Sequence, residues 1–246
     1  MAEPAFDVEG VFGEDYLYFF AESLDARAAA ETELIWRLLE LEPGVEVLDL
    51  ACGHGRIANA LAARGCVVTG LDVTPLFLDR ARQDASALGV TVRYLDGDMR
   101  SLPWPAERFD RVVNWFSAFG YFDDAGNQQV LEQVARVLRP GGRFTVEMNS
   151  RDWVIAHFQP ASVAERDGNL AIDQREFEPL TGRMINERTI IRDGHIRRMP
   201  YFVRMLTFTE LRDWLLNAGF SGAEGFGENG EALGVDSHRM ITVAHR

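Results

Sequence analysis

Residues 47–56 read Val-Leu-Asp-Leu-Ala-Cys-Gly-His-Gly-Arg, and their surroundings decide the fold of this chain. An apolar run over 45–50 predicts a buried strand that breaks abruptly into a turn. Gly53 and Gly55 predict that the backbone of this turn can approach a ligand without interference from a Cβ atom.

The next 20 or so residues continue the pattern. A helical pattern opens at Arg56, and a second apolar run over 67–71 ends at Asp72, 19 residues after Gly53. This order of strand, turn, helix, strand and acid is typical of an open α/β sheet that binds a nucleoside-bearing cofactor. Asp72 would then accept hydrogen bonds from both ribose hydroxyls.

The glycine pattern also fits a dinucleotide site, because Gly53, Gly55 and Ala58 match G-x-G-x-x-A. Asp49, however, lies inside the strand, four residues before Gly53. A carboxylate there is poorly placed for a pyrophosphate and well placed to hold ordered water or a cationic amino group. A nicotinamide-dependent oxidoreductase therefore remains an alternative.

Further motifs extend the pattern, and with them the chain resembles the class I, Rossmann-like methyltransferases that use S-adenosylmethionine. The matching pieces are V-L-D-L-A-C-G-H-G-R (47–56), G-L-D-V-T (70–74), G-D-M-R (97–100), F-D-R-V-V-N-W-F-S (109–117) and L-R-P-G-G-R-F (138–144). The resemblance implies a doubly wound, mostly parallel seven-stranded sheet with an antiparallel last strand. It implies S-adenosyl-L-methionine as cofactor and S-adenosyl-L-homocysteine as product.

Apolar periodicity predicts the elements of the core. Continuous apolar runs, as in a parallel sheet covered on both faces, predict strands near 45–50, 67–71, 91–95, 109–115 and 142–148. Helical patterns lie near 14–40, 55–64, 75–88 and 126–138.

After residue 148 the pattern changes. Alternating residues with glycine turns predict a three-strand antiparallel excursion over 172–179, 184–192 and 196–207. A helix capped by Thr209 and ended by Gly219 should follow, and then strands over 220–226 and 238–244. We expect one domain with four parts: an N-terminal helical lid (1–40), a cofactor-binding core (45–148), a β cover over the acceptor site (150–207) and a C-terminal helix and hairpin (209–246).

The resemblance assigns cofactor contacts to the ends of the strands. The loop after the first strand should hold the amino-acid tail and ribose, Asp98 the adenine amine, and Met99 the adenine ring. The expected cofactor-binding residues are Tyr16, Asp49, Ala51, Cys52, Gly53, Gly55, Arg56, Asp72, Val73, Asp98, Met99, Asn114, Trp115 and Phe116.

The acceptor side is less determined. The aromatic-rich segment after the fourth strand and the ends of later strands supply the expected substrate-binding residues Phe119, Tyr121, Asn149 and Arg204. No general base stands out, and the candidates for the catalytic step are Asn149, Glu147, His157 and Tyr16. No Cys/His cluster has metal-ligand spacing, so we expect no metal.

Charge bears on the substrate class. With 25 Lys and Arg against 38 Asp and Glu, the net charge of −13 argues against a nucleic-acid partner. The segment after the fourth strand also lacks the Asn/Asp-Pro-Pro-aromatic motif of enzymes that methylate base amines or glutamine amides. A run of arginines remains, and we expect them to be exposed on alternating strands: Arg183, Arg188, Arg192, Arg197, Arg198 and Arg204.

The remaining features suggest a soluble, cytoplasmic protein. Two cysteines, no evident signal peptide and no apolar run near the ~20 residues of a membrane span favour this location. The expected function is methyl transfer to a small molecule, with the acceptor atom (N, O or C) and the oligomeric state left open. The alternatives are a cofactor-binding protein or cyclase-like enzyme without methyl transfer, and the oxidoreductase named above.

Overall fold

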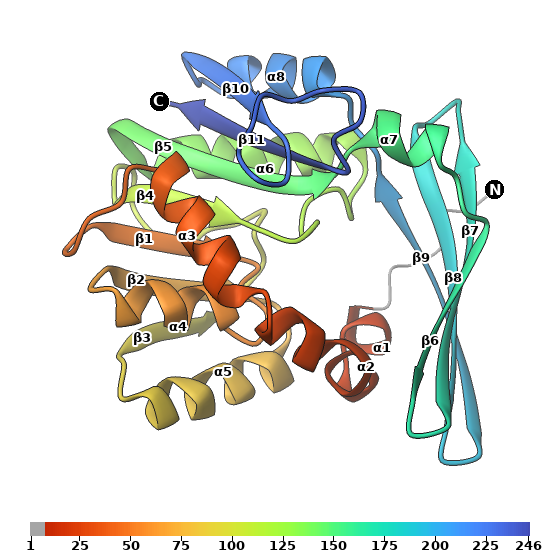
Figure 1. Cartoon of the computed structure of the whole chain (residues 1–246). Coiled ribbons are helices and arrows are strands. Elements are labelled where there is room, and N and C mark those ends of the chain that lie inside the picture. Colours follow the sequence, from red (N-terminus) through yellow and green to blue (C-terminus); the bar gives the residue numbers. More distant parts are fainter. Residues whose placement is uncertain (1–7) are drawn as a thin grey trace.

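The computed structural model describes residues 8–246. A seven-stranded sheet in the order β10-β11-β5-β4-β1-β2-β3 forms its centre (Figure 1). The strands are β1 (Glu46–Leu50), β2 (Val67–Asp72), β3 (Val92–Asp96), β4 (Phe109–Asn114), β5 (Leu138–Asn149), β10 (Gly222–Phe226) and β11 (Arg239–His245). The strands from β3 to β5 are parallel, and β11 is antiparallel to both its neighbours. The expected fold class is thereby confirmed.

Helices cover both faces of this sheet. The helices of the core are α3 (Ala28–Leu38), α4 (Arg56–Ala63), α5 (Pro75–Leu88), α6 (Asp124–Val137) and α8 (Phe208–Asn217). Side chains on the two faces of the sheet form two separate hydrophobic cores. On one face, Val47, Val68 and Val113 pack with α3, α4 and α5. On the other face, Leu48, Val112 and Phe144 pack with α6 and α8. The doubly wound architecture follows from this burial on both faces.

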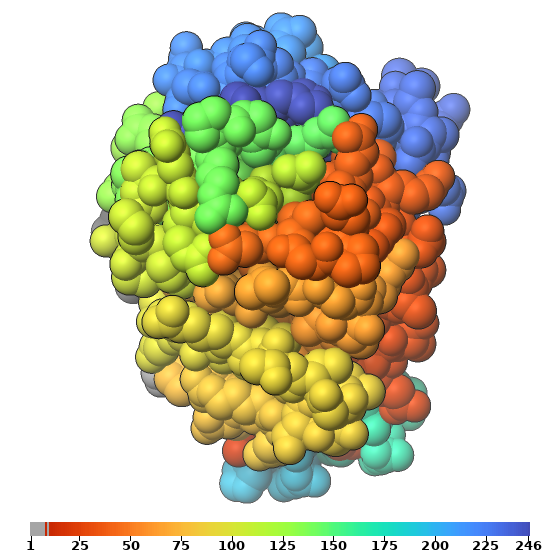
Figure 2. Space-filling view, turned by 90° about the vertical axis from the view of Figure 1, so that its left-hand side faces the viewer, coloured from red at the N-terminus to blue at the C-terminus, as the bar shows by residue number. Residues whose placement is uncertain are grey.

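A second sheet stands opposite the carboxyl ends of the parallel strands (Figure 1). Its four antiparallel strands are β6 (Ala161–Arg166), β7 (Asn169–Glu178), β8 (Arg183–Arg192) and β9 (His195–Arg204). The short helices α1 (Val8–Val11) and α2 (Glu14–Asp25) lie between the two sheets. Seen from the left-hand side of Figure 1, segments of the seven-stranded core and its helices fill the surface, and only small parts of the second sheet show at the bottom (Figure 2).

Three details of the sequence-based prediction are wrong, and one helix was missed. The second sheet has a fourth strand, β6, at its edge. The side chains of β6 alternate between exposed and half-buried and none is fully buried, so the apolar pattern of this strand is weak. The helical stretch 14–40 is two helices, α2 and α3, broken after Asp25, and α7 (Arg151–Ala156) was not expected.

The third error concerns the N-terminus of α8. Thr207 caps this helix, because its Oγ1 accepts the Glu210 amide at 3.3 Å while the Glu210 carboxylate accepts the Thr207 amide at 2.9 Å. Thr209 already lies inside the helix. The spacing T-x-x-E is the capping-box pattern, which outweighs the simple preference for a threonine just before the apolar stripe.

Candidate functional site

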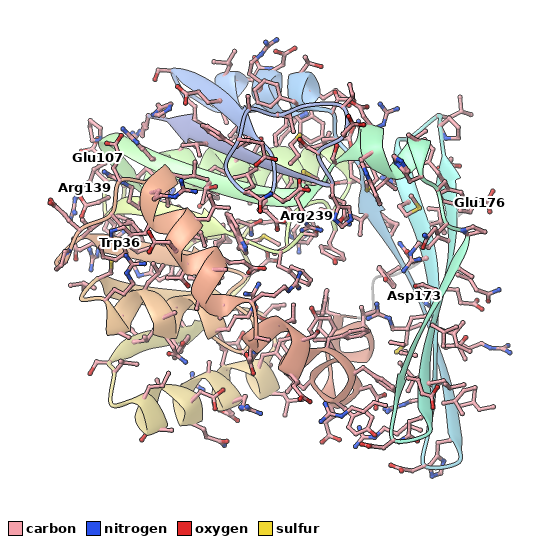
Figure 3. All side chains as sticks on the ribbon, in the orientation of Figure 1. Trp36, Glu107, Arg139, Asp173, Glu176 and Arg239 are labelled. Carbon is pink, nitrogen blue, oxygen red and sulfur yellow. The ribbon has the colours of Figure 1, made fainter. Side chains whose placement is uncertain are left out.

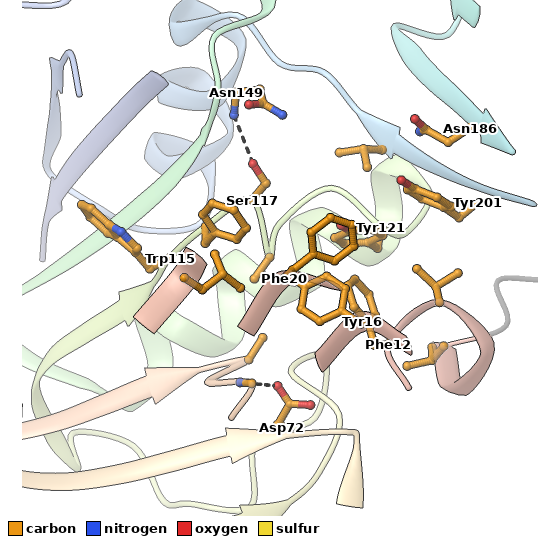
Figure 4. A pocket seen from close by; sticks show the side chains of 18 of the residues that line it. Phe12, Tyr16, Phe20, Asp72, Trp115, Ser117, Tyr121, Asn149, Asn186 and Tyr201 are labelled. Atoms are coloured by element: carbon orange, nitrogen blue, oxygen red, sulfur yellow. Dashed lines mark hydrogen bonds between the residues drawn. The ribbon is translucent and has the colours of Figure 1, made fainter. Parts of the chain in front are cut away.

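A cavity of about 700 Å³ lies between the two sheets, at the carboxyl ends of β1, β2 and β4 (Figure 4). Helices α1, α2 and α7 and the inner face of the second sheet complete its wall. Ligands of open α/β sheets bind at this edge, because loops and helix N-termini converge there.

The loop after β1 folds as its glycines predict. Ala51, Gly53 and Gly55 all have positive φ (57°, 55° and 78°). Gly53 lines the cavity, whereas Gly55 does not. A Cβ on Gly55 would lie 2.3 Å from the Tyr94 hydroxyl, so this glycine permits α4 to pack close to β3.

Asp49 is the most unusual group of this loop. It is 2% exposed, it lines the cavity, and its Oδ2 has no hydrogen-bond partner among residues 8–246. Burial raises its pKa to about 7, against the attraction of the Arg56 guanidinium. A buried carboxylate with an orphaned oxygen, in the wall of a cavity, is suited to a cationic amino group.

Asp72 ends β2 and is fixed by two backbone amides. Its Oδ2 accepts from Gly53 at 2.7 Å, and its Oδ1 accepts from Thr74 at 2.9 Å. Burial raises its pKa even though these hydrogen bonds oppose the shift. The side chain lines the cavity, so the carboxylate is placed where it could accept hydrogen bonds from ligand hydroxyls.

The remaining expected cofactor residues divide into two groups. Ala51, Cys52, Arg56, Val73, Asp98, Met99, Trp115 and Phe116 line the cavity. The Asp98 carboxylate accepts a hydrogen bond from Arg100 Nη2 at 2.6 Å, and the hydrogen bonds from Arg100 lower the pKa of Asp98. Asn114 is fully buried and donates to the Leu50 carbonyl at 2.9 Å, so it joins β4 to β1 and does not line the cavity.

The end of β4 is held in an unusual backbone conformation. Phe116 and Ser117 both have positive φ, 63° and 54°. Consecutive left-handed residues that are not glycine are uncommon and cluster at functional sites. The Phe116 ring faces the guanidinium groups of Arg56 at 5.5 Å and Arg239 at 5.4 Å from its centroid.

Arg239 is a cavity residue that the sequence reasoning missed. It opens β11 opposite Asn149 of β5, and it binds the Glu147 carboxylate, the Asn149 side chain and Ser117 Oγ. Glu147 also accepts the Phe116 amide at 2.6 Å. The signal available in the sequence was the charged Arg239 at the start of an apolar strand, where it pairs with Asn149.

The catalytic candidates fall into different positions. Asn149, His157 and Tyr16 line the cavity, whereas Glu147 lies behind Arg239 and Phe116 and does not. The His157 ring stacks on Trp153 at 4.6 Å between centroids. Tyr16 contacts Phe77 at 5.6 Å, and burial raises its pKa.

Two expected substrate residues lie elsewhere. Phe119 is fully buried in the core under α6, and Arg204 pairs with Asp124 and Glu210. Neither lines the cavity, whereas Tyr121 and Asn149 do. An aromatic run next to a loop cannot by its sequence show which rings turn inward.

The arginines of the second sheet are not all exposed as expected. Arg188 and Arg204 are buried, with 9% and 8% exposure. Arg188 lines the cavity with Asp173, Arg175, Asn186 and Tyr201, none of which the sequence singled out. Buried arginines require acidic partners, and the partner here, Asp173, is on a neighbouring strand.

Comparison with known proteins agrees with this geometry. Residues 47–142 match the methyltransferase domain family. A demethylmenaquinone methyltransferase of Thermus thermophilus is 39% identical over 121 residues, which are 46% of this chain and 54% of that protein. The chain spans 37% to 54% of the length of such curated relatives.

Solved structures extend the likeness to nearly the whole chain. The CcbJ methyltransferase of Streptomyces caelestis has a TM-score of 0.75 at 23% identity, over 89% of this chain and 91% of that one. CalS10, an amino pentose methyltransferase of Micromonospora echinaspora, has a TM-score of 0.64 at 21% identity, over 90% and 91%. Residues 47–142 therefore match the methyltransferase domain family, and the chain as a whole shares the Rossmann-like fold of these solved methyltransferases.

Proposed function

We propose that this protein transfers a methyl group from S-adenosylmethionine to a small molecule bound in the cavity between the two sheets. One observation carries the proposal: the orphaned Oδ2 of Asp49 and the fixed carboxylate of Asp72 line the same cavity. The first suits the amino group of the cofactor and the second suits its ribose hydroxyls. Asp72 would suit the ribose of either cofactor, but the Asp49 carboxylate would repel a negatively charged pyrophosphate, so the oxidoreductase alternative is less favoured.

The other cofactor contacts follow from position. Gly53 leaves room beside the ribose, and Met99 and Asp98 lie where the adenine would bind. Asp98, which also pairs with Arg100, would accept a hydrogen bond from the adenine amine. When bound, the cofactor supplies a methyl group on a positively charged sulfur, which is already activated for displacement.

The chain's own residues then have to position the acceptor and exclude water. Helices α1 and α2 would act as the lid and the second sheet as the cover, because both contribute to the cavity wall. The aromatic side chains Phe12, Tyr16 and Phe20 face the cavity from the lid (Figure 4). An acceptor that arrives as a neutral amine needs no base; for one that must lose a proton, His157 is the candidate.

The cavity size and the charge of the chain support a small acceptor. A volume of about 700 Å³ is in the usual range for small-molecule sites. The net charge of −13 disfavours nucleic acid. Among residues 8–246 no helix is long and apolar enough to cross a membrane. Cys52 and Cys66 are both free, which favours the proposed cytoplasmic location.

The test has two stages. Calorimetry should show that S-adenosylhomocysteine binds and NAD(H) does not; the reverse result would overturn the proposal. Labelled S-adenosylmethionine should then transfer its methyl group to at least one member of a panel of small amines, phenols and carboxylates. Binding without transfer to any member would favour the non-methylating alternative, and labelling of tRNA or rRNA fragments alone would overturn the substrate class.

A further inference from the structure

The inner face of the second sheet carries a polar patch that faces the cavity. Antiparallel register sets Asp173 of β7 opposite Arg188 of β8, and Asn186 of β8 opposite Tyr201 of β9. All four side chains line the cavity. Asp173 lies on the side of the sheet that faces the core, whereas Glu176 projects from the outer side (Figure 3).

Arg188 is the centre of this patch. Its side chain is 11% exposed; Nε and Nη2 donate to the Asp173 carboxylate at 2.7 and 3.0 Å, and Nη2 also lies 3.3 Å from the Tyr201 hydroxyl. Its Nη1 makes no hydrogen bond to any group of residue 8 or of residues 10–246. The guanidinium is therefore held rigidly by one edge and keeps donors for a ligand.

The charge of the patch is positive. Arg175 also donates to Asp173, at 3.3 Å, so one carboxylate is shared by two guanidinium groups. Together the three groups carry a net charge of one positive unit. The same carboxylate holds the pKa of Arg188 above its usual value, although burial opposes this shift.

Three phenols surround the guanidinium. Tyr16, Tyr121 and Tyr201 interact electrostatically with Arg188, from α2, from the loop after β4 and from β9. Burial raises the pKa of all three, that of Tyr201 to about 12, so the hydroxyls stay protonated at neutral pH. Of the three, the Tyr201 hydroxyl lies 3.3 Å from Arg188 Nη2, so a protonated phenol stands directly beside the cation.

The acids of the cavity do not oppose this arrangement. Asp49 lies in β1 and Asp72 ends β2, on the proposed cofactor side of the cavity, and Asp98 is paired with Arg100. Beside the patch, the Phe20 ring lies under the Arg188 guanidinium at 5.0 Å and offers a flat apolar surface. A ligand that matches both features has a planar apolar body with an anionic end.

We propose that the methyl acceptor carries a carboxylate, that Arg188 and the hydroxyl of Tyr201 bind this carboxylate, and that the methyl group goes to another atom of the molecule. The inference rests on the proposed function and names the substrate class of its site. A carboxylate fits better than a phosphate, because one net positive charge balances a monoanion and would leave a dianion under-compensated in a buried site.

Paired probes test the proposal in solution. Benzoate, 4-aminobenzoate and 3-phenylpropanoate are titrated calorimetrically into protein saturated with S-adenosylhomocysteine, and each is compared with its primary amide. The expected result is that at least one carboxylate binds about ten-fold or more tighter than its amide, because a hydrogen-bonded charge is lost in the amide. Equal affinities within each pair, or no binding of any carboxylate, would overturn the proposal.

Variants locate the binding to the patch. Tyr201→Phe removes one hydroxyl. The double change Arg188→Gln with Asp173→Asn removes both charges of the buried pair while keeping similar shapes. Arg175, the second partner of Asp173, is 26% exposed and keeps its hydrogen bond to Ser162 Oγ in this variant. Both variants should bind the carboxylate more weakly and bind its amide with unchanged affinity. Arg198→Gln, at an exposed position of β9, should change neither affinity. Undiminished carboxylate binding by both patch variants would overturn the assignment to Arg188 and Tyr201.

Binding of S-adenosylhomocysteine separates the two proposals. If the wild-type protein does not bind it, the proposed function fails. If it binds and the probes do not discriminate, only the carboxylate proposal fails. Inorganic phosphate is titrated alongside, and phosphate binding tighter than that of every carboxylate would contradict the choice of a monoanion.

Discussion

The Asp72 carboxylate accepts the Gly53 amide at 2.7 Å and thereby joins the tip of β2 to the loop after β1. The two residues are 19 positions apart in the sequence, and the parallel register of β1 with β2 brings them together. The bond orients the carboxylate toward the cavity and holds the glycine turn at the same time. Cofactor affinity and loop geometry are therefore coupled at this contact.

Asp72→Ala should weaken the binding of S-adenosylhomocysteine by about 1.5–3 kcal/mol, because charge-assisted hydrogen bonds to two ribose hydroxyls are lost. Calorimetry measures the affinity, and circular dichroism checks that the variant is folded. Asp96→Ala is the matched control, since Asp96 pairs with Asp72 across β2 and β3 but is exposed and does not line the cavity. Wild-type affinity in Asp72→Ala would show that the carboxylate does not hold the ribose.

Asp49 should make stability and cofactor binding depend on pH in opposite directions. Its folded pKa of about 7 lies above the ordinary value of 3.8, so the folded protein holds a proton that the unfolded chain has released. Between pH 4 and 7 this group therefore lowers the stability of the ligand-free protein as pH rises. Thermal melting of wild type against Asp49→Asn should show the variant gaining relative stability from pH 5 to pH 7.5.

Cofactor affinity should change the other way in the same pH range. An ammonium group prefers ionised Asp49, so S-adenosylhomocysteine should bind more tightly as pH rises from 5.5 to 7.5, by up to about ten-fold per pH unit below the pKa. Asp49→Asn should bind weakly with a flat profile. A wild-type profile as flat as that of the variant would contradict the assignment of Asp49 to the amino group.

Gly55→Ala should destabilise the protein strongly. The new Cβ would lie 2.3 Å from the Tyr94 hydroxyl and 2.7 Å from Ala81 Cβ, in a left-handed conformation. Strain and overpacking together should cost about 3 kcal/mol or more of unfolding free energy, measured by urea denaturation. Gly89→Ala has a similar φ of 67° with open space around it, and should lose only about 1–2 kcal/mol. Similar losses at both glycines would show that the approach to Tyr94 is not what requires Gly55.

Arg239→Gln should also destabilise the chain, because it leaves the Glu147 carboxylate, with 5% exposure, without its cation. Breaking a buried pair in this way costs about 3–5 kcal/mol. The double variant Glu147→Gln with Arg239→Gln should recover much of this loss in urea denaturation. No recovery would mean that Arg239 acts through Ser117 and Phe116 and not through the buried charge.

The sequence by itself determined the elements whose signals are local. Continuous apolar runs predicted the parallel strands, since such strands are buried on both faces. Gly53, Asp49 and Asp72 were expected at one edge of the sheet, because a short loop fixes where they lie, and all three line the cavity. Boundaries were less accurate, as at Thr207, where two side chains three residues apart decide the start of the helix.

Only the tertiary structure decided the acceptor end of the cavity. Asp173 and Arg188 come from different strands, and whether an alternating strand turns a given arginine inward depends on register, which the sequence of that strand does not encode by itself. Phe119 and Tyr121 are two residues apart, yet one is core and the other cavity wall. Arg239 reaches its partners only because β11 runs antiparallel beside β5. Long-range pairing places these side chains, and packing of the whole chain selects that pairing.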